Sequence, residues 1–306
     1  MLSYTVRRLL GAIPTILIII AVAFFMIRLA PGGPFDGERP IPIEIKRNLE
    51  KVYHLDEPLY MQFGRYMVNI LQGDFGPSFK YKDYSVNELI GQGFPYSLQI
   101  GMIAILIAAT AGIFFGTIAA LRQNSFGDYG TMTLAMIGIT IPNFVVAPIL
   151  ILLFAVIWGL LPAGGITQGW TSFILPIVAL ALPPTAYIAR LTRASMIEVL
   201  RSNFVRTARA KGLPERVTIM RHSLKAGLLP VVSYLGPATA GIITGSVVIE
   251  QIFGIPGVGR YFVQAALNRD YTLVMGVVIF FAALIITFNL LVDLLYGVLD
   301  PRVRYD

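Results

Sequence analysis

The chain contains no cysteine and only two histidines, His54 and His222, among its 306 residues. The absence of cysteine excludes a disulfide framework, a thiolate metal site and a thiol nucleophile. Charged residues are also scarce, because they make up 13% of the chain against roughly 25% in a typical soluble domain. The sequence therefore lacks the charged surface that is typical of soluble proteins.

Apolar residues dominate instead, with 56% of the chain hydrophobic and a mean hydropathy of +0.72. Several uncharged runs approach or exceed the roughly 20 residues that cross a bilayer as a helix. The run at about residues 132–161 is long enough to be tilted or bent. The pattern predicts an all-α polytopic membrane protein with six transmembrane helices, at about residues 9–29, 98–120, 132–161, 173–189, 227–249 and 273–292.

The first apolar run follows Arg7 and Arg8, as the core of a signal peptide would. It is longer than the roughly 7–15 residues of such a core, and no small-x-small cleavage site follows it. We therefore predict a retained span, and domain boundaries of 1–30 for this N-terminal helix, 31–95 for an extracytoplasmic segment, 96–299 for a membrane core and 300–306 for a cytoplasmic tail.

Charge predicts the orientation of the spans. Residues 190–225 contain nine basic and two acidic residues. The net charge of this segment, +7, equals that of the whole chain. Residues 31–95 contain seven basic and nine acidic residues. The positive-inside rule places the basic segment in the cytoplasm and the acidic one outside, so six spans leave both termini cytoplasmic. This rule explains the positive charge without nucleic acid as a partner.

The acidic segment is predicted to be a small helical cap. One helix covers about residues 43–54 after Pro42, and a second starts near Pro58. Glycine, aspartate and proline mark residues 73–78 as a loop. Two roles stay open for this cap: it rests on the membrane bundle, or it forms a docking surface for an extracytoplasmic partner.

The basic segment carries more than charge. Gly212 is predicted to end a helix in the left-handed conformation, and Pro214 to start a second helix with Glu215 at its positive end. A charge cluster that only fixes topology needs no such joint, so a docking protein is the favoured interpretation. The first helix is expected to run on from the fourth span with an apolar stripe of Met196, Leu200, Phe204 and Ala208.

This segment resembles the cytoplasmic coupling loop of ABC-importer permeases, whose motif is Glu-Ala-Ala-x3-Gly-x9-Ile-x-Leu-Pro. Here an arginine replaces the acid, and a histidine and a lysine replace the isoleucine and the proline. The form is similar to that of the oligopeptide, dipeptide and nickel branch. The motif positions that we compare are Arg206, Thr207, Ala208, Gly212, His222, Leu224 and Lys225.

Other stretches agree with that branch, at residues 28–32, 73–86, 192–200, 249–259, 268–271 and 293–302. The chain is identified as a member of the oligopeptide/dipeptide ABC transporter permease family, most similar to the oligopeptide permeases of Gram-negative bacteria. The resemblance implies a type I ABC importer permease fold in the bacterial inner membrane, with the small extracytoplasmic helical segment after the first helix.

The resemblance also implies partners. These are a second homologous permease subunit, two ABC ATPase subunits, a periplasmic binding protein and a peptide substrate. The chain would be a transport subunit and not an enzyme, with ATP and magnesium bound by the ATPase subunits and no cofactor of its own. No GxxxxGK[ST] motif occurs here. Coupling would pass through residues 206–224, including Leu213 and Pro214.

Two other functions remain in competition. A carrier driven by an ion gradient favours inverted repeats and buried acids at mid-membrane, and an intramembrane enzyme needs a catalytic or metal constellation within the spans. Neither pattern is visible, and the spans separate the two histidines, so no catalytic or metal site is predicted. Glu250 is expected to lie close enough to a span end for solvation and to have a structural role.

Small and polar residues within the spans have several interpretations. The Gly112/Gly116 and Gly241/Gly245 pairs favour close helix packing or a bundle with internal cavities. Polar side chains there line a substrate path or have packing roles, and sequence alone does not separate the two. The candidates for the path are Asn143, Ser233, Thr244 and Asn289, with Thr140 and Thr239 beside them.

Overall fold

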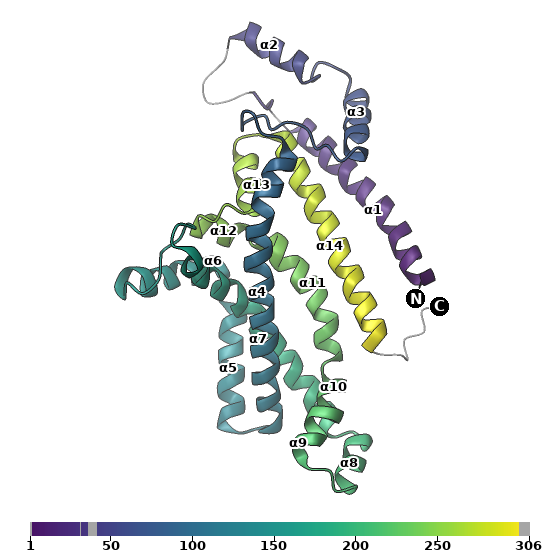
Figure 1. Cartoon of the computed structure of the whole chain (residues 1–306), viewed down its shortest axis with the longest axis vertical. Coiled ribbons are helices and arrows are strands. Elements are labelled where there is room, and N and C mark those ends of the chain that lie inside the picture. Colours follow the sequence, from purple (N-terminus) through teal and green to yellow (C-terminus); the bar gives the residue numbers. More distant parts are fainter. Residues whose placement is uncertain (1, 31, 36–41, 300–306) are drawn as a thin grey trace.

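The computed structural model describes residues 2–30, 32–35 and 42–299, and every named element among them is a helix (Figure 1). This confirms the all-α prediction for the described part of the chain. The tail at 300–306 lies outside the described residues. The elements are α1 (Leu2–Leu29), α2 (Ile43–Val52), α3 (Leu59–Leu71), α4 (Val86–Leu121), α5 (Phe126–Thr140), α6 (Asn143–Leu150), η1 (Ile151–Ile157), η2 (Gly169–Phe173), α7 (Ile174–Leu200), α8 (Asn203–Ala210), α9 (Glu215–Val217), η3 (Thr218–Ser223), α10 (Leu224–Gly227), α11 (Leu229–Gly245), α12 (Val247–Phe253), α13 (Val258–Leu267) and α14 (Tyr271–Leu299).

Among the described residues, four segments are long and apolar enough to cross a membrane as they stand, and two bent pairs bring the number to six if each is one span. The pair of α5 with α6 and η1 bends by 103°, and the pair that ends in α11 bends by 51°. The third predicted run is therefore strongly bent. Pro142 explains the break, because it precedes α6 and holds Ile141 in an extended conformation. The four single spans are Leu10–Leu29, Val86–Leu121, Gly169–Leu200 and Tyr271–Val292.

Small residues bring α4 and α7 together. A methyl group on Gly112 would lie 2.7 Å from Ile188, and one on Gly116 would lie 2.7 Å from Thr192 Cβ and overlap a backbone carbonyl of α7. This GxxxG pair therefore packs helices closely. Gly241 differs, because a methyl group there would have no heavy atom within 4 Å. It borders an open space instead.

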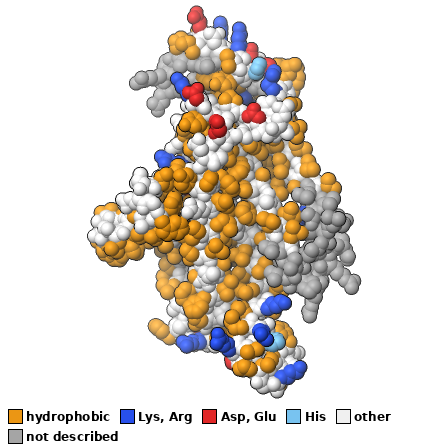
Figure 2. Space-filling view, in the orientation of Figure 1, with side chains coloured by type: hydrophobic (Ala, Val, Ile, Leu, Met, Phe, Trp, Pro, Cys, Tyr) orange, Lys and Arg blue, Asp and Glu red, His pale blue; other side chains and the backbone are white. Residues whose placement is uncertain are grey.

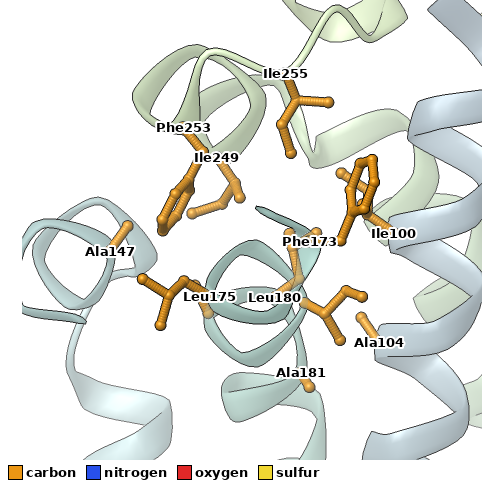
Figure 3. Close-up of a cluster of buried hydrophobic side chains, with 12 residues drawn as sticks. Ile100, Ala104, Ala147, Phe173, Leu175, Leu180, Ala181, Ile249, Phe253 and Ile255 are labelled. Carbon is orange, nitrogen blue, oxygen red and sulfur yellow. The ribbon is translucent and has the colours of Figure 1, made fainter. Parts of the chain in front are cut away.

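A buried apolar cluster fixes the bent elements on the bundle (Figure 3). Side chains from α4, α6, α7 and α12 point toward one another in it, so the short helices α6 and α12 are held against the long ones. Close packing of this kind is what orders helices that an apolar solvent alone would not drive together. The labelled members are Ile100, Ala104, Ala147, Phe173, Leu175, Leu180, Ala181, Ile249, Phe253 and Ile255.

The segment after α1 forms a cap over one end of the bundle (Figure 1). Its helices α2 and α3 confirm the two predicted ones, and α3 follows Pro58 as expected. The ring of Phe63 on α3 lies 5.3 Å from that of Phe24 on α1. Asp270, fully buried before α14, accepts hydrogen bonds from the Ser78 hydroxyl and, at 3.1 Å, from the Phe79 amide. The cap is thereby anchored to both α1 and α14.

Charged residues lie mainly at the two ends of the molecule (Figure 2). Hydrophobic side chains cover the middle of the face shown, with acidic and basic residues above them on the cap and lysines and arginines at the opposite end. That lower end is formed by α8, α9 and α10 (Figure 1). The arrangement is that of an apolar belt between two polar ends, as a bilayer requires.

Candidate functional site

A basic elbow, residues 203–227, projects from the end opposite the cap (Figure 1). It consists of α8, a turn, and the continuous helical turns α9, η3 and α10. Gly212 adopts φ +76° after α8, and Pro214 starts α9, so both predicted roles are confirmed. A methyl group on Gly212 would meet nothing within 4 Å. Glycine is needed there for its backbone conformation and not for space.

An ion pair closes the elbow across this turn. The Arg209 guanidinium donates from Nε to Glu215 Oε2 at 3.1 Å and from Nη2 to Oε1 at 2.6 Å. The carboxylate beside it raises the pKa of Arg209 above its usual value. Glu215 was predicted only to lie at the positive end of the helix dipole. The sequence did contain a signal for this ion pair, because Arg209 and Glu215 have opposite charges and lie on the two sides of Gly212.

The predicted apolar stripe is wrong as a single helix. α7 ends at Leu200, and α8 begins after Ser202. Ser202 occupies the N-cap position of α8, where an extended backbone is usual, and this interrupts the helix. Met196 and Ala208 are buried, whereas Phe204 is 48% exposed. The break turns part of the stripe outward, where Phe204 joins Leu213 and Met220 as exposed apolar residues of the elbow.

The coupling-motif residues are brought together in part. Arg206 and Thr207 are exposed on α8, Ala208 is buried beside them, and Leu224 is half-buried on the returning helix α10. α10 packs against α7, where a methyl group on Gly227 would lie 2.6 Å from Met196 Sδ. The elbow is therefore seated on the end of α7.

A pocket of about 350 Å³ lies between α5, α6, α7 and α11. The rings of Tyr187 and Tyr234 stack across it at 4.3 Å. Asn143 projects into it, and its Oδ1 is buried without a hydrogen-bond partner. The lining residues are Ile139, Asn143, Leu180, Pro183, Pro184, Tyr187, Tyr234, Ala238, Gly241 and Ile242.

The other polar candidates for the path do not line this pocket. Ser233 donates to the Leu229 carbonyl at 3.2 Å, and Thr244 donates to the Ala240 carbonyl at 2.8 Å, so both hydroxyls satisfy their own helix. Asn289 lies on α14, and its Oδ1 is buried and unpaired. The paired tyrosines and the two prolines of α7 were missed, because an apolar sequence gives no sign of which face borders a space.

Glu250 corrects another expectation. Its side chain is fully buried and not solvated, although α12 is short. Ser97 Oγ donates to Glu250 Oε1 at 2.7 Å, the Arg260 amide donates to Oε2 at 3.1 Å, and Ser246 also donates to Oε1. A buried carboxylate requires such donors. Glu250 thus ties α4, α12 and α13 together, which supports its structural role.

A second ion pair, with a buried carboxylate, joins α5 to α7. Asp128 is 1% exposed, and Arg193 donates to its two oxygens, from Nε at 2.5 Å and from Nη2 at 2.7 Å. The amide of Asn124 donates to the same carboxylate at 2.9 Å. This pair was not predicted, because nothing local in the sequence connects residues so far apart.

Comparison with known proteins identifies the chain. The family model described as the binding-protein-dependent transport system inner membrane component matches residues 112–305, and the N-terminal model of such components matches residues 1–101. The chain belongs to this family. The permease is 56% identical over 306 residues to the oligopeptide transport system permease protein OppB of Escherichia coli K12, with all of both chains covered.

Other relatives agree. OppB of Haemophilus influenzae is 53% identical to the permease over the full length of both chains. The dipeptide transport system permease protein DppB of Bacillus subtilis is 47% identical over 307 residues, which covers 99% of this chain and 98% of DppB. The predicted recognition of the oligopeptide/dipeptide permease family is confirmed, and the chain is a transport component and not an enzyme.

Two solved structures show the fold. An amino acid ABC transporter solved with histidines matches with a TM-score of 0.56 at 18% identity, over 69% of this chain and 94% of that one. The MetNI methionine ABC transporter, in inward-facing conformations, matches with a TM-score of 0.56 at 16% identity, over 69% and 96%. The permease therefore has the type I ABC importer fold that the resemblance implied.

In this inner membrane permease, one helix connects the two parts of the site. The pocket residues Leu180, Pro183 and Tyr187 lie on α7. Further along the same helix, Arg193 binds α5 and Met196 contacts the elbow. One continuous helix therefore runs from the walls of the pocket to the elbow.

Proposed function

We propose that the chain is the permease subunit of an ATP-driven oligopeptide importer. The observation that supports this most strongly is the 56% identity to an oligopeptide permease over the full length of both chains. At this similarity and coverage, a shared transport role with a peptide substrate is the simplest expectation. The dipeptide relative at 47% supports the same substrate class.

In this proposal the chain works with partners. A second homologous permease subunit completes the translocation path, two ABC ATPase subunits dock on the elbow, and a periplasmic binding protein delivers peptide. The exposed Phe204, Leu213 and Met220 beside basic residues suit a protein interface, because apolar anchors with a charged rim are typical of one. ATP binding then shifts the population between two states of the bundle.

The path and the orientation follow from the same proposal. The pocket with Asn143 forms part of the path, and Ser233, Thr244 and Asn289 are further candidates on α11 and α14. The cap faces outward and the elbow inward. The start of α1 and the last turns of α14 lie at the side of the bundle away from the cap (Figure 1). Both termini would therefore be cytoplasmic.

Uptake of a labelled peptide by proteoliposomes tests the proposal. Vesicles that hold the permease pair with the ATPases, binding protein outside and ATP inside are expected to import peptide. Omission of the ATPases should abolish uptake, and an uncoupler should leave it unchanged. Uptake that persists without the ATPases and disappears with the uncoupler would indicate a carrier driven by an ion gradient instead.

A further inference from the structure

A second pocket, of about 430 Å³, lies under the cap and apart from the elbow and the interhelical pocket. The end of α1 forms one wall with Phe24 and Arg28, and α3 forms another with Gln62, Arg65 and Tyr66. Its volume is in the range of small-ligand sites.

Arg28 brings a positive charge to this pocket. Its guanidinium lies 5.4 Å from the ring centre of Phe24 and 5.9 Å from that of Tyr271. Within the described ranges 2–30, 32–35 and 42–299, no carboxylate pairs with it. Arg65 differs, because Glu57 holds it at 2.8 Å. The charge available to a ligand is therefore that of Arg28.

The same pocket contains polar atoms that are available for hydrogen bonds. Arg28 Nε, Tyr66 Oη and Gln62 Oε1 are buried and make no hydrogen bond within the described part of the chain. Burial raises the pKa of Tyr66, so its hydroxyl stays protonated and can donate. Gln62 donates from Nε2 to the Leu55 carbonyl at 3.1 Å and the Glu57 carbonyl at 2.7 Å, which leaves Oε1 as an acceptor. Unpaired buried groups are unfavourable, so two donors and one acceptor here suit a ligand that carries both acceptors and a donor.

The position of the pocket indicates the source of that ligand. Arg28 lies in the last turn of the apolar segment Leu10–Leu29, where a membrane-spanning helix reaches the lipid headgroups. Apolar side chains at the ends of these two helices are exposed, with Met26 at 68% and Leu29 at 72% on α1 and Leu71 at 81% on α3. Acyl chains can cover such residues while a headgroup enters the pocket.

We propose that this pocket binds the phosphate of a phospholipid headgroup from the leaflet on the cap side. The Arg28 fork and the Tyr66 hydroxyl donate to the phosphate oxygens, since a guanidinium matches that geometry. Gln62 Oε1 accepts from the ammonium or hydroxyl of the headgroup. The lipid then links α1 to α3 and stabilises the cap on the bundle. This inference does not depend on the transported substrate.

Native mass spectrometry of the full-length chain, purified in mild detergent within its complex, tests the proposal. Dihexanoyl phosphatidylethanolamine and dihexanoyl phosphatidylglycerol are the lipid probes, and inorganic phosphate is a separate arm. Arg28→Gln should lower bound lipid about tenfold, because a charged hydrogen-bonding group is lost. Tyr66→Phe should lower it less, and Arg28→Lys should retain most of it. Lys82→Gln is the matched control, since it removes one exposed charge from the same cap.

A thermal shift distinguishes binding from misfolding. Added short-chain lipid should raise the Tm of the wild type, Arg28→Lys and Lys82→Gln, but not of Arg28→Gln. Competition by inorganic phosphate at the same concentration as lipid would replace the headgroup with a free anion and overturn the lipid assignment. Equal lipid retention by wild type and Arg28→Gln would overturn it as well. So would a loss of binding-protein association in Arg28→Gln with lipid binding unchanged.

Discussion

Two ion pairs of similar geometry have opposite surroundings. Asp128 is 1% exposed where it meets Arg193, whereas Glu215 is 54% exposed where it meets Arg209. A charge that is buried away from water is stabilised by an oppositely charged partner, because no solvent compensates an unpaired buried carboxylate. Exposed pairs contribute little, since water screens them. The first pair therefore holds α5 against α7, and the second mainly shapes the elbow.

Arg193→Met is accordingly expected to destabilise the permease by about 3–5 kcal/mol, because it leaves the buried Asp128 carboxylate unpaired. Arg209→Met is the control, with an expected cost of about 0–1 kcal/mol. Denaturation in detergent measures both, and the double variant Asp128→Leu with Arg193→Met should recover part of the loss. Equal effects of the two single variants would contradict the assigned burial.

At the scale of elements, the elbow carries exposed apolar side chains at a basic end of the molecule. Phe204, Leu213 and Met220 are exposed there, on α8, the turn and η3. In a membrane protein, apolar exposure on the lipid-facing middle needs no explanation. On a basic end outside the apolar belt (Figure 2), it favours a protein interface.

The combined change Phe204→Ser and Met220→Ser is expected to weaken ATPase association about tenfold or more, because two apolar anchors are removed. Membrane insertion should be normal, since both side chains are exposed on the elbow and neither contributes to the buried core of the bundle. Co-purification of the ATPase subunits measures the effect. Met61→Ser, at a residue of the cap that is 53% exposed, is the control and should change nothing. Undiminished association of the double variant would place the interface elsewhere.

Sequence patterns predicted the elements that local signals determine. Pro58 and Gly212 mark a helix start and a helix end through their own backbone preferences, and both predictions were confirmed. Tertiary context decided the rest. Nothing local shows that Ser202 interrupts the stripe, or that Glu250 is buried between α4 and α13. Of the residues that line the interhelical pocket, Asn143 alone was a predicted candidate for the path, because the apolar residues around it resemble those that face lipid.

At the scale of the whole molecule, the account requires the cap and the elbow on opposite sides of the membrane. The chain has no cysteine, so a single introduced cysteine is its only thiol. Met61→Cys should react with an impermeant maleimide added to intact cells, and Met220→Cys should react only after the membrane is opened. The same side for both positions would contradict six spans and the proposed orientation.

The central claim is that the elbow transmits the action of the ATPases to the transport path. Gly212 is its most sensitive point, because φ +76° is strongly unfavourable for a β-branched residue but accessible to asparagine. The decisive measurement is peptide uptake, with ATPase activity recorded in parallel, for Gly212→Val and Gly212→Asn in the assembled transporter. The account predicts that the valine variant inserts normally but loses uptake and peptide-stimulated hydrolysis, while the asparagine variant retains most of both. Full uptake by the valine variant would contradict it.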